Sequence, residues 1–436
     1  MALGGGVFTS TNKKLSGTYV NFVSAKRAVA VLSERGIAAI PVVLDWGKSN
    51  EVVTITNEDF QKKSLELLGY PFDHEKLKGL RDLFMNINTL YLYRLDNGST
   101  KASNTFAEAV CGGARGNDIK IVIAANVNDE TKYDVSTLIG DELVDIQTVA
   151  NASELVANDF VTFKSGATLT VTAATPLSGG SNGSAVTVSQ YSAFLEAVEM
   201  YAFNALGCPV ADKAIIRLFV EFTKRMRDEH GVKFQTVVFQ YAEADYEGVV
   251  SVENKVTDDE NEASLVYFTT GIIAGCAVNK SNTNMTYNGE FKVETKHTQA
   301  QLAEALEDGK FIYHKVLNEV RVLEDINTLV TFTDSKSIDF ASNQTIRVID
   351  QIANDTAVLF NTKYLGKIAN NESGRTSLWS DVVAMYKQLE RIQAIETFDS
   401  SKVVVSQGDT KKSVILQGEV VPVHAMTHLY LTCVIG

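Results

Sequence analysis

The two ends of the chain are rich in strand-forming residues, but neither end has an evident partner strand beside it. The last stretch, residues 412–436, contains many β-formers and closes on an apolar run. The first stretch is a Gly/Ser/Thr-rich arm, residues 1–16, that leads into the short β segment Gly17–Phe22. A strand without a partner in its own sheet can complete the open edge of a sheet in another copy. The two ends therefore predict a self-assembling protein.

Composition limits the classes of protein that the 436 residues can form. A hydrophobic content of 45% and a charged content of 21% are typical of globular domains with sizeable cores. The formal net charge of −13 disfavours nucleic acid as a partner, because phosphates attract a basic surface. The most apolar run, residues 263–278, is interrupted by Thr and Gly and is shorter than the roughly 20 residues that span a bilayer. We expect a buried helix there, no membrane insertion and no signal peptide.

Strands and helices alternate along most of the chain, which predicts an α/β core. Short apolar runs bounded by Gly or by turn residues indicate buried strands, and amphipathic spacing indicates the helices. The predicted strands are Gly36–Trp46, Asn88–Leu95, Phe234–Gln240, Phe311–Tyr313 and Thr328–Thr333. The predicted helices are Asn57–Leu68, Gln190–Leu206, Ala211–His230 and one that begins with a capping box at Thr298 and Gln301.

Two regions depart from this alternation. Residues 98–179 are rich in Thr, Val, Asn and Asp and contain period-two segments such as Asp118–Ala124 and Ala167–Thr172, which predicts an inserted all-β domain. From residue 336 onward, two long amphipathic helices, Gln344–Tyr364 and Ser377–Ile395, precede strands at 403–406, 413–421 and 426–434. We therefore predict an arm at 1–22, a discontinuous α/β core at 23–97 and 180–335, the insert at 98–179, and an α+β C-terminal domain at 336–436.

One segment has a catalytic spacing. Gly179–Gly183 fits the G-x-S-x-G pattern, which would make Ser181 the nucleophile of a serine hydrolase. That motif needs a strand directly before the serine and a helix directly after it, whereas Pro176 precedes it and residues 184–189 separate it from the next helix. The histidines and cysteines show no metal spacing, and no phosphate-binding loop is present. We expect no cofactor, no metal and no enzymatic activity, and keep the hydrolase as an alternative.

Taken together, several segments resemble the tail sheath proteins of contractile phages and of R-type bacteriocins, particularly those of Gram-positive bacteria, clostridia among them. The resemblance spans nearly the whole chain and keeps the order of segments in the family. The segments are Gly17–Phe22, Arg35–Gly47, Tyr91–Arg94, Ala114–Ile119, Leu177–Gly183, Tyr246–Val252, Glu324–Leu329, Ile346–Asp350, Tyr364–Asn371 and Val421–Tyr430.

The resemblance implies a contractile tail sheath subunit. Such a subunit polymerises as stacked six-subunit rings around the tail tube and contracts to drive the tube through the target cell envelope. Its C-terminal domain faces the tube and is completed by strands from neighbouring subunits. The implied partners are further copies, the tail tube protein, and the baseplate and tail terminator proteins. The implied location is the bacterial cytoplasm during assembly and a released phage tail or tail-like particle afterwards.

The resemblance also assigns residues to two inter-subunit linkers. The N-terminal linker comprises Thr18, Tyr19, Val20, Asn21 and Phe22, and the C-terminal linker comprises Leu429, Tyr430, Leu431, Thr432 and Val434. On the helix at 377–395, the polar side carries Lys387, Glu390 and Arg391, which we take as candidate tube contacts. An ordinary solvated helix face is the other interpretation of these three residues. A non-contractile shell or adhesion protein remains the alternative assembly.

Overall fold

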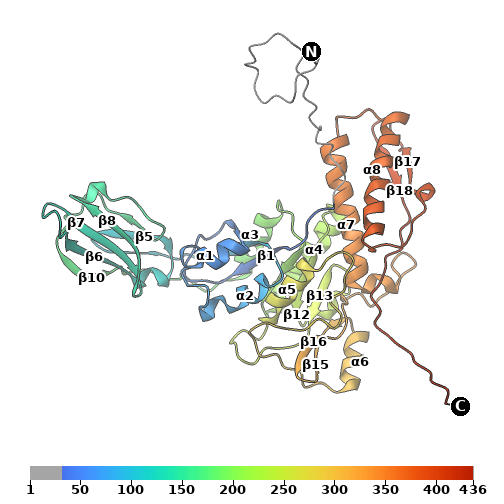
Figure 1. Ribbon diagram of the computed structural model, residues 1–436, viewed down its shortest axis with the longest axis horizontal. Helices are drawn as coiled ribbons and strands as arrows, with labels where there is room; N and C mark the ends of the chain where they lie inside the picture. The colour runs from blue at the N-terminus through green and yellow to red at the C-terminus, as the bar shows by residue number, and fades with distance from the viewer. Residues whose placement is uncertain (1–31, 436) are drawn as a thin grey trace, which may run out of the picture. The chain divides into compact units, whose positions relative to one another are not determined.

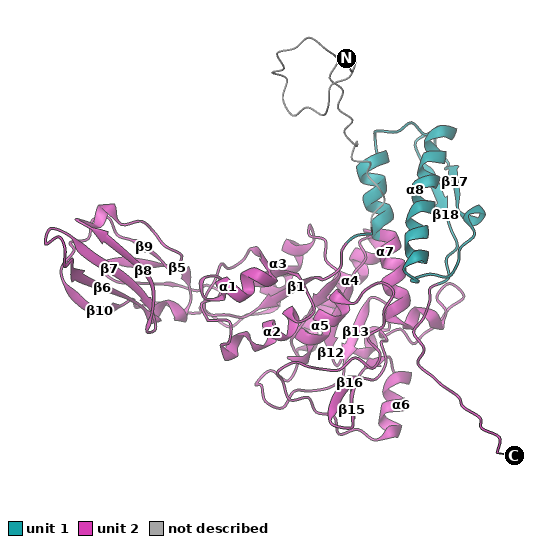
Figure 2. Cartoon of the chain, viewed as in Figure 1, with its two compact units in different colours: residues 1–33, 354–421 teal, residues 34–353, 422–436 magenta. Residues whose placement is uncertain are grey.

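The computed structural model describes residues 32–435 (Figure 1). The chain divides into two compact units (Figure 2). Of the described residues, the larger unit contains 34–353 together with 422–435, and the smaller unit contains 354–421 together with 32 and 33. The predicted N-terminal linker, Thr18 to Phe22, lies outside the described residues.

A seven-stranded sheet forms the centre of the larger unit. Its order is β14-β13-β12-β11-β1-β3-β2, and all neighbours are parallel except β2, which runs antiparallel to β3. The strands are β1 (Ile37–Val42), β2 (Val52–Thr56), β3 (Thr89–Arg94), β11 (Ala205–Gly207), β12 (Gln235–Phe239), β13 (Val249–Val252) and β14 (Lys310–Phe311). Five of the six residues of β1 are buried, as we predicted for a strand that is covered on both faces.

Helices cover both faces of this sheet. Ala38 and Ile40 of β1 belong to one apolar cluster, whereas Ala39 belongs to another, and successive strand residues point to opposite faces. The first cluster takes residues from α1 (Asn57–Leu68), α2 (Lys78–Phe84) and α5 (Leu265–Gly275). The second takes residues from α3 (Val188–Val198) and α4 (Lys213–Lys224). The predicted α/β core is therefore confirmed.

Local sequence signals place several helix ends correctly. Thr56 and Asp59 form a capping box at the start of α1, and Thr298 and Gln301 form the predicted one at the start of α6 (Gln299–Glu307). Helix α5 is the predicted buried apolar helix, with nine of its eleven residues buried. Within residues 32–435, no helix combines the length and apolar character that a bilayer span requires.

Three of the elements predicted before residue 336 are wrong. The helix predicted over Gln190–Leu206 stops at Val198, because Ala205–Gly207 pairs with β1 and β12 as strand β11. Residues 328–333 form no strand; instead Thr328 donates its backbone N–H to Val249 O and its hydroxyl to Tyr246 O. Residues 167–171 lie in a loop, and the strand there begins only at Thr172.

The insert between β3 and α3 consists of two sheets with a common apolar core. One sheet has the order β10-β6-β7-β8 and the other β4-β5-β9. Its strands are β4 (Lys101–Ser103), β5 (Ala107–Gly112), β6 (Ile119–Ala125), β7 (Tyr133–Ile139), β8 (Glu142–Val149), β9 (Val161–Phe163) and β10 (Thr172–Pro176). The all-β insert that we predicted is thus a β-sandwich. A separate hairpin, β15 (Tyr313–Val316) with β16 (Glu319–Val322), follows β14.

The C-terminal part contains two long helices and one hairpin. Helix α7 (Asn343–Leu359) runs on into a π-helical turn at Phe360–Tyr364, and α8 spans Glu372–Arg391. Helix α8 begins five residues before the predicted start, because the side chain of Asn371 caps it by accepting from Gly374 N. Strands β17 (Val404–Gln407) and β18 (Val414–Gln417) form the hairpin. The strand predicted over Met426–Val434 is not formed, since no described segment pairs with these residues.

Candidate assembly surfaces

The C-terminal segment, residues 426–435, carries large apolar side chains that are almost fully exposed. The exposed fraction is 90% for Leu429 and for Tyr430, 79% for Leu431 and 91% for Val434. Thr432 is exposed as well. Contiguous exposed apolar side chains mark surfaces that bind another molecule. The structure thus leaves all five residues of the predicted C-terminal linker uncovered; that they link subunits remains a prediction.

The start of this segment is held by the side chain of one glutamine. Gln344, in the first turn of α7, donates Nε2–H to Val423 O at 2.9 Å, and its Oε1 accepts from Ala425 N at 3.0 Å. A carboxamide can therefore pair with an extended backbone as a neighbouring strand would. Beside it, Thr345 Oγ1 and His424 Nε2 lie 3.1 Å apart. The sequence analysis missed this contact, and the only signal was the polar triplet Asn343-Gln344-Thr345 at a helix start.

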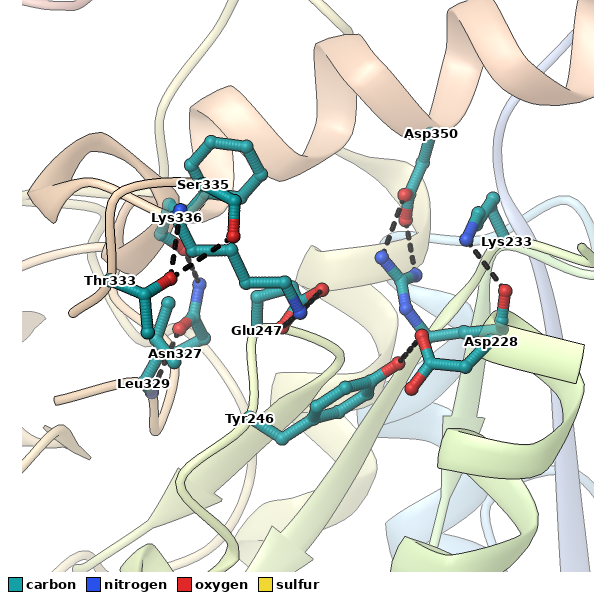
Figure 3. Close-up of polar contacts among 12 residues, drawn as sticks. Asp228, Lys233, Tyr246, Glu247, Asn327, Leu329, Thr333, Ser335, Lys336 and Asp350 are labelled. Atoms are coloured by element: carbon teal, nitrogen blue, oxygen red, sulfur yellow. Dashed lines mark hydrogen bonds and ion pairs between the residues drawn. The ribbon is translucent and has the colours of Figure 1, made fainter. Parts of the chain in front are cut away.

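A buried ion pair fixes the first half of α7 against the π-helical turn, Arg225–Glu229, that follows α4. Arg227 makes a bidentate contact with Asp350, with its two terminal nitrogens 2.6 and 2.8 Å from the carboxylate oxygens. Burial by itself lowers the pKa of Arg227, but the Asp350 carboxylate more than offsets burial, so the pKa is raised. Figure 3 shows Asp350 pointing from the helix toward the strands. The side chains of Arg227 and Asp350 are only 2% and 8% exposed. Water cannot solvate either charge there, so each charge depends on the other.

A second buried pair lies on the same helix. Arg347 donates to Asp325 Oδ2 at 2.6 Å, and both side chains are almost fully buried. The nearby Arg35 donates to the carbonyls of Ile273 and Cys276. Burial and the positive charge of Arg347 lower the pKa of Arg35 to about 10. Helix α7 therefore meets the core through charged groups as well as apolar ones.

The loop that leads into α7 is tied down by a second polar cluster (Figure 3). Lys336 Nζ lies 2.8 and 2.9 Å from the carboxylate oxygens of Glu247 and 5.2 Å from the ring centroid of Tyr246. The Tyr246 hydroxyl donates to Asp228 Oδ1 at 2.8 Å. Burial and the Asp228 carboxylate raise the pKa of Tyr246, which keeps the phenol protonated. The approach to α7 is consequently fixed by polar contacts to the segment that contains Tyr246 and Glu247.

The β17–β18 hairpin offers two open strand edges. Among the described residues, no strand pairs with the outer edge of either β17 or β18. Trp379 Nε1 of α8 donates to Val403 O at 2.9 Å, and Asn370 Nδ2 donates to Ser413 O at 2.8 Å, so the hairpin is held from one side. A two-stranded hairpin is marginal by itself and gains stability from added strands. Its free edges are therefore candidate sites for strand addition.

The candidate tube contacts lie on the solvent side of α8. Lys387 and Arg391 are exposed and Glu390 is half-buried, whereas Val382, Tyr386 and Leu389 are buried. In the part of the chain that the structure describes, none of the three takes part in an ion pair. The side chains are thus available to an external partner, and their contact with a tube remains a prediction.

The hydrolase interpretation of Ser181 is wrong. Ser181 is exposed in a loop, where its backbone N–H donates to Thr100 O and its hydroxyl lies 3.0 Å from Thr100 Oγ1. The next helix, α3, begins only at Val188, so the strand–serine–helix geometry is absent from this loop. The loop closes the insert by bonding its two ends together.

Among residues 32–435, no group of three or more His, Cys, Asp or Glu side chains could hold a metal ion.

Sequence-family models match almost the whole chain in four consecutive pieces. They are the tail sheath protein Gp18 domain III N-terminal region at residues 35–95, the phage tail sheath protein β-sandwich domain at 96–182, the phage tail sheath protein central domain at 184–328, and the phage tail sheath C-terminal domain at 335–436. The match at 96–182 covers the β-sandwich described above. The order of the four pieces agrees with a core that the insert interrupts.

Individual relatives agree with these matches. The phage-like element PBSX protein XkdK of Bacillus subtilis is 33% identical over 98% of the chain and 99% of its own length. The crystal structure of a sheath tail protein from Desulfitobacterium hafniense is 38% identical, with a TM-score of 0.82 over 93% of this chain and 96% of that one. The helical sheath of the anti-feeding prophage in its contracted state has a TM-score of 0.57 at 12% identity, covers 97% of this chain and 99% of that one, and shows the fold alone. The chain therefore belongs to the phage tail sheath protein family, whose members are structural proteins rather than enzymes.

Proposed function

We propose that this protein polymerises as stacked six-subunit rings around a tail tube, and that the polymer contracts to drive the tube through the envelope of a target cell. Its partners are then further copies of the chain, the tail tube protein, and the baseplate and tail terminator proteins. Family membership supports the sheath role. The contraction, the six-fold rings and the tube partner are inferences that go beyond it.

The exposed C-terminal segment is the observation that carries this proposal. Six of its ten residues have large apolar side chains that are at least 79% exposed, and the segment has no strand partner among the described residues. Adding such a segment to an open strand edge of a neighbour forms a row of backbone hydrogen bonds, each worth about 0.5–1.5 kcal/mol net. A strand of several residues then provides a joint of a few kcal/mol that tolerates changes in the angle between subunits.

Contraction needs such a joint because the subunits must move without separating. We propose that the extended sheath is metastable and that contraction brings the α/β cores into larger, better-packed contacts. A gain of a few kcal/mol per subunit suffices, because many subunits contribute to one polymer. The Gln344 contact supports this scheme, since it holds the root of the linker to the core while residues 426–435 stay free to follow a neighbour.

Deletion of the two linkers tests the proposal. Chains that lack residues 1–22 or residues 426–436 should be folded and soluble, by circular dichroism and gel filtration, but should form no long sheaths in electron micrographs. A third chain, with Leu429, Tyr430 and Leu431 replaced by Ser, keeps the backbone and loses only apolar contacts, so we expect shorter sheaths rather than none. Long sheaths from either deletion would contradict the linker role.

The tube-facing role of α8 has its own test. Lys387→Glu combined with Arg391→Glu should reduce co-assembly with the tail tube protein at least tenfold, because two contacts become repulsive, while sheath polymerisation without a tube stays normal. Lys48→Glu combined with Lys62→Glu is the matched control, since both lysines are exposed and make only surface ion pairs. Pelleting with purified tube measures the effect, and equal pelleting of both variants would remove α8 from the tube interface.

A further inference from the structure

A groove of about 510 Å³ lies in the larger unit. Its apolar lining includes Leu306 at the end of α6, and Leu329, Val330, Phe332 and Ile338 from the segment between β16 and α7. Val330, Phe332 and Ile338 are 39%, 44% and 69% exposed. These side chains therefore meet solvent unless another chain segment covers them. We call this site the acidic groove, because Glu307, Glu324 and Asp325 also line it.

All the formally charged side chains that line the groove are acidic. Glu307 is exposed and has no ion-pair partner among the described residues. Glu324 is partly exposed, and its one ion-pair contact in this part of the chain is His428 Nε2 at 3.9 Å. Asp325 is buried and paired with Arg347. An apolar groove lined by two carboxylates that have no lysine or arginine partner among the described residues fits a segment that combines apolar side chains with lysine or arginine.

The N-terminal arm has this composition. Residues 1–31 contain Lys13, Lys14, Lys26 and Arg27 and not one Asp or Glu. The whole chain carries −13 and the arm carries four positive charges, so residues 32–436 carry −17. The same arm supplies apolar side chains at Val7, Phe8 and Leu15. Charge and apolar content thus both match the arm to the groove.

We propose that the acidic groove binds the N-terminal arm of an adjacent copy. Val7, Phe8 and Leu15 cover the apolar lining, and Lys13 and Lys14 pair with Glu307 and Glu324. Fully extended, 31 residues reach about 100 Å, which is ample for a neighbouring subunit. An arm in its own groove would join no copies, so the assignment to another copy rests on the proposed function. The groove site is additional to the strand addition proposed above.

Charge exchange tests the contact. Glu307→Lys with Glu324→Lys should raise the critical concentration for polymerisation about tenfold, and so should Lys13→Glu with Lys14→Glu, because each places like charges together. A chain that carries all four substitutions should recover most of the loss. Glu130→Lys with Glu243→Lys is the matched control, since both residues are exposed and unpaired among the described residues, and it should leave the critical concentration within twofold. If the critical concentration of the chain with all four substitutions stays as high as that of either double variant, the proposal is overturned.

Carbodiimide cross-linking of intact particles distinguishes the remaining outcomes, since it joins a lysine to a carboxylate in direct contact. In particles assembled from ¹⁴N- and ¹⁵N-labelled chains, we expect peptides with Lys13 or Lys14 linked to Glu307 or Glu324, half of them of mixed label. Cross-links of single label only would mean that the arm occupies its own groove. Absence of these cross-links in particles that still need residues 1–22 would overturn the groove assignment and leave the linker role intact. Normal sheaths without residues 1–22 would instead contradict the proposed function.

Discussion

At the residue scale, the contacts of α7 show that buried charge, rather than apolar periodicity, locates this helix. The amphipathic spacing of the predicted helix favours Ile346, Ile349, Ala353 and Phe360 as core residues, but of these only Ile346 is fully buried. The buried positions are largely polar: Asn343, Gln344, Thr345, Arg347, Asp350, Gln351 and Asp355. Amphipathic spacing identifies the helix correctly, but it cannot show which polar side chain meets a partner more than a hundred residues away, as Asp350 meets Arg227.

The Arg227–Asp350 pair leads to a prediction about stability. Asp350→Asn leaves the Arg227 guanidinium buried without a counter-charge, so it should lower the free energy of unfolding by about 3–5 kcal/mol. Glu199→Gln removes the partner of the more exposed Arg225, at 2.9 Å, and should cost less than about 1 kcal/mol. Urea denaturation followed by circular dichroism compares the two. Equal costs would mean that the buried pair is no more important than a surface one.

At the element scale, the end of α1 depends on a glycine that local sequence alone explains only in part. Gly69 has φ of +80°, the left-handed conformation that favours glycine at a helix C-terminus. A Cβ atom there would also lie 2.5 Å from the Cβ of Trp46, the fully buried side chain that stacks on Phe160 of the insert. The close approach of α1 to Trp46 is therefore part of how the core meets the insert.

A pair of glycine substitutions separates these two effects. Gly69→Ala should destabilise the protein by about 3 kcal/mol, because backbone strain and a clash with Trp46 add together. Gly98→Ala has nearly the same φ, +84°, but its Cβ meets no atom within 4 Å, so we expect only about 1 kcal/mol. Thermal denaturation of the two variants gives the comparison. If both shift the melting temperature alike, the contact with Trp46 contributes little.

The elements that the sequence predicts best are those with signals inside a single segment. Capping boxes at Thr56 and Thr298 begin α1 and α6, and the apolar run of β1 reports its burial on both faces. The errors fall where another part of the chain decides the outcome. Ala205–Gly207 is a strand only because β1 and β12 flank it, and Met426–Val434 lacks the neighbour that would make it one. Pairing over long sequence separations leaves no local mark.

At the scale of the whole molecule, the chain enters the β-sandwich and leaves it at adjoining points. The chain enters at Asn97 and returns at Ser184, whose N–H donates to Asn97 O at 2.9 Å. Asn97 and Gly183 also form an isolated bridge. Entry and exit thus adjoin, so the sandwich behaves as an insertion that a core could lose or acquire. The change of composition after residue 97 was the sequence signal for it.

Removal of the insert should leave a folded core. In a chain that lacks residues 99–182 and has two glycines added between Gly98 and Gly183, we expect the helical circular dichroism signal to persist. The seven-stranded sheet keeps all its strands in this chain. The cost is exposure of Trp46. In a Trp379→Phe background, Trp46 is the one tryptophan left, and its emission should shift to longer wavelength than in the parent. Loss of the helical signal would mean that the sandwich is needed for the core to fold.

The carboxamide of Gln344 touches only main-chain atoms of Val423 and Ala425. It consequently excludes only proline at position 425, which has no N–H to donate, and imposes no other requirement on the side chains at those two positions or after them. The residues after Ala425 can then diverge in sequence together with the surface that they bind. A C-terminal segment transplanted from a distant relative would leave the host subunit in the same direction as the native segment.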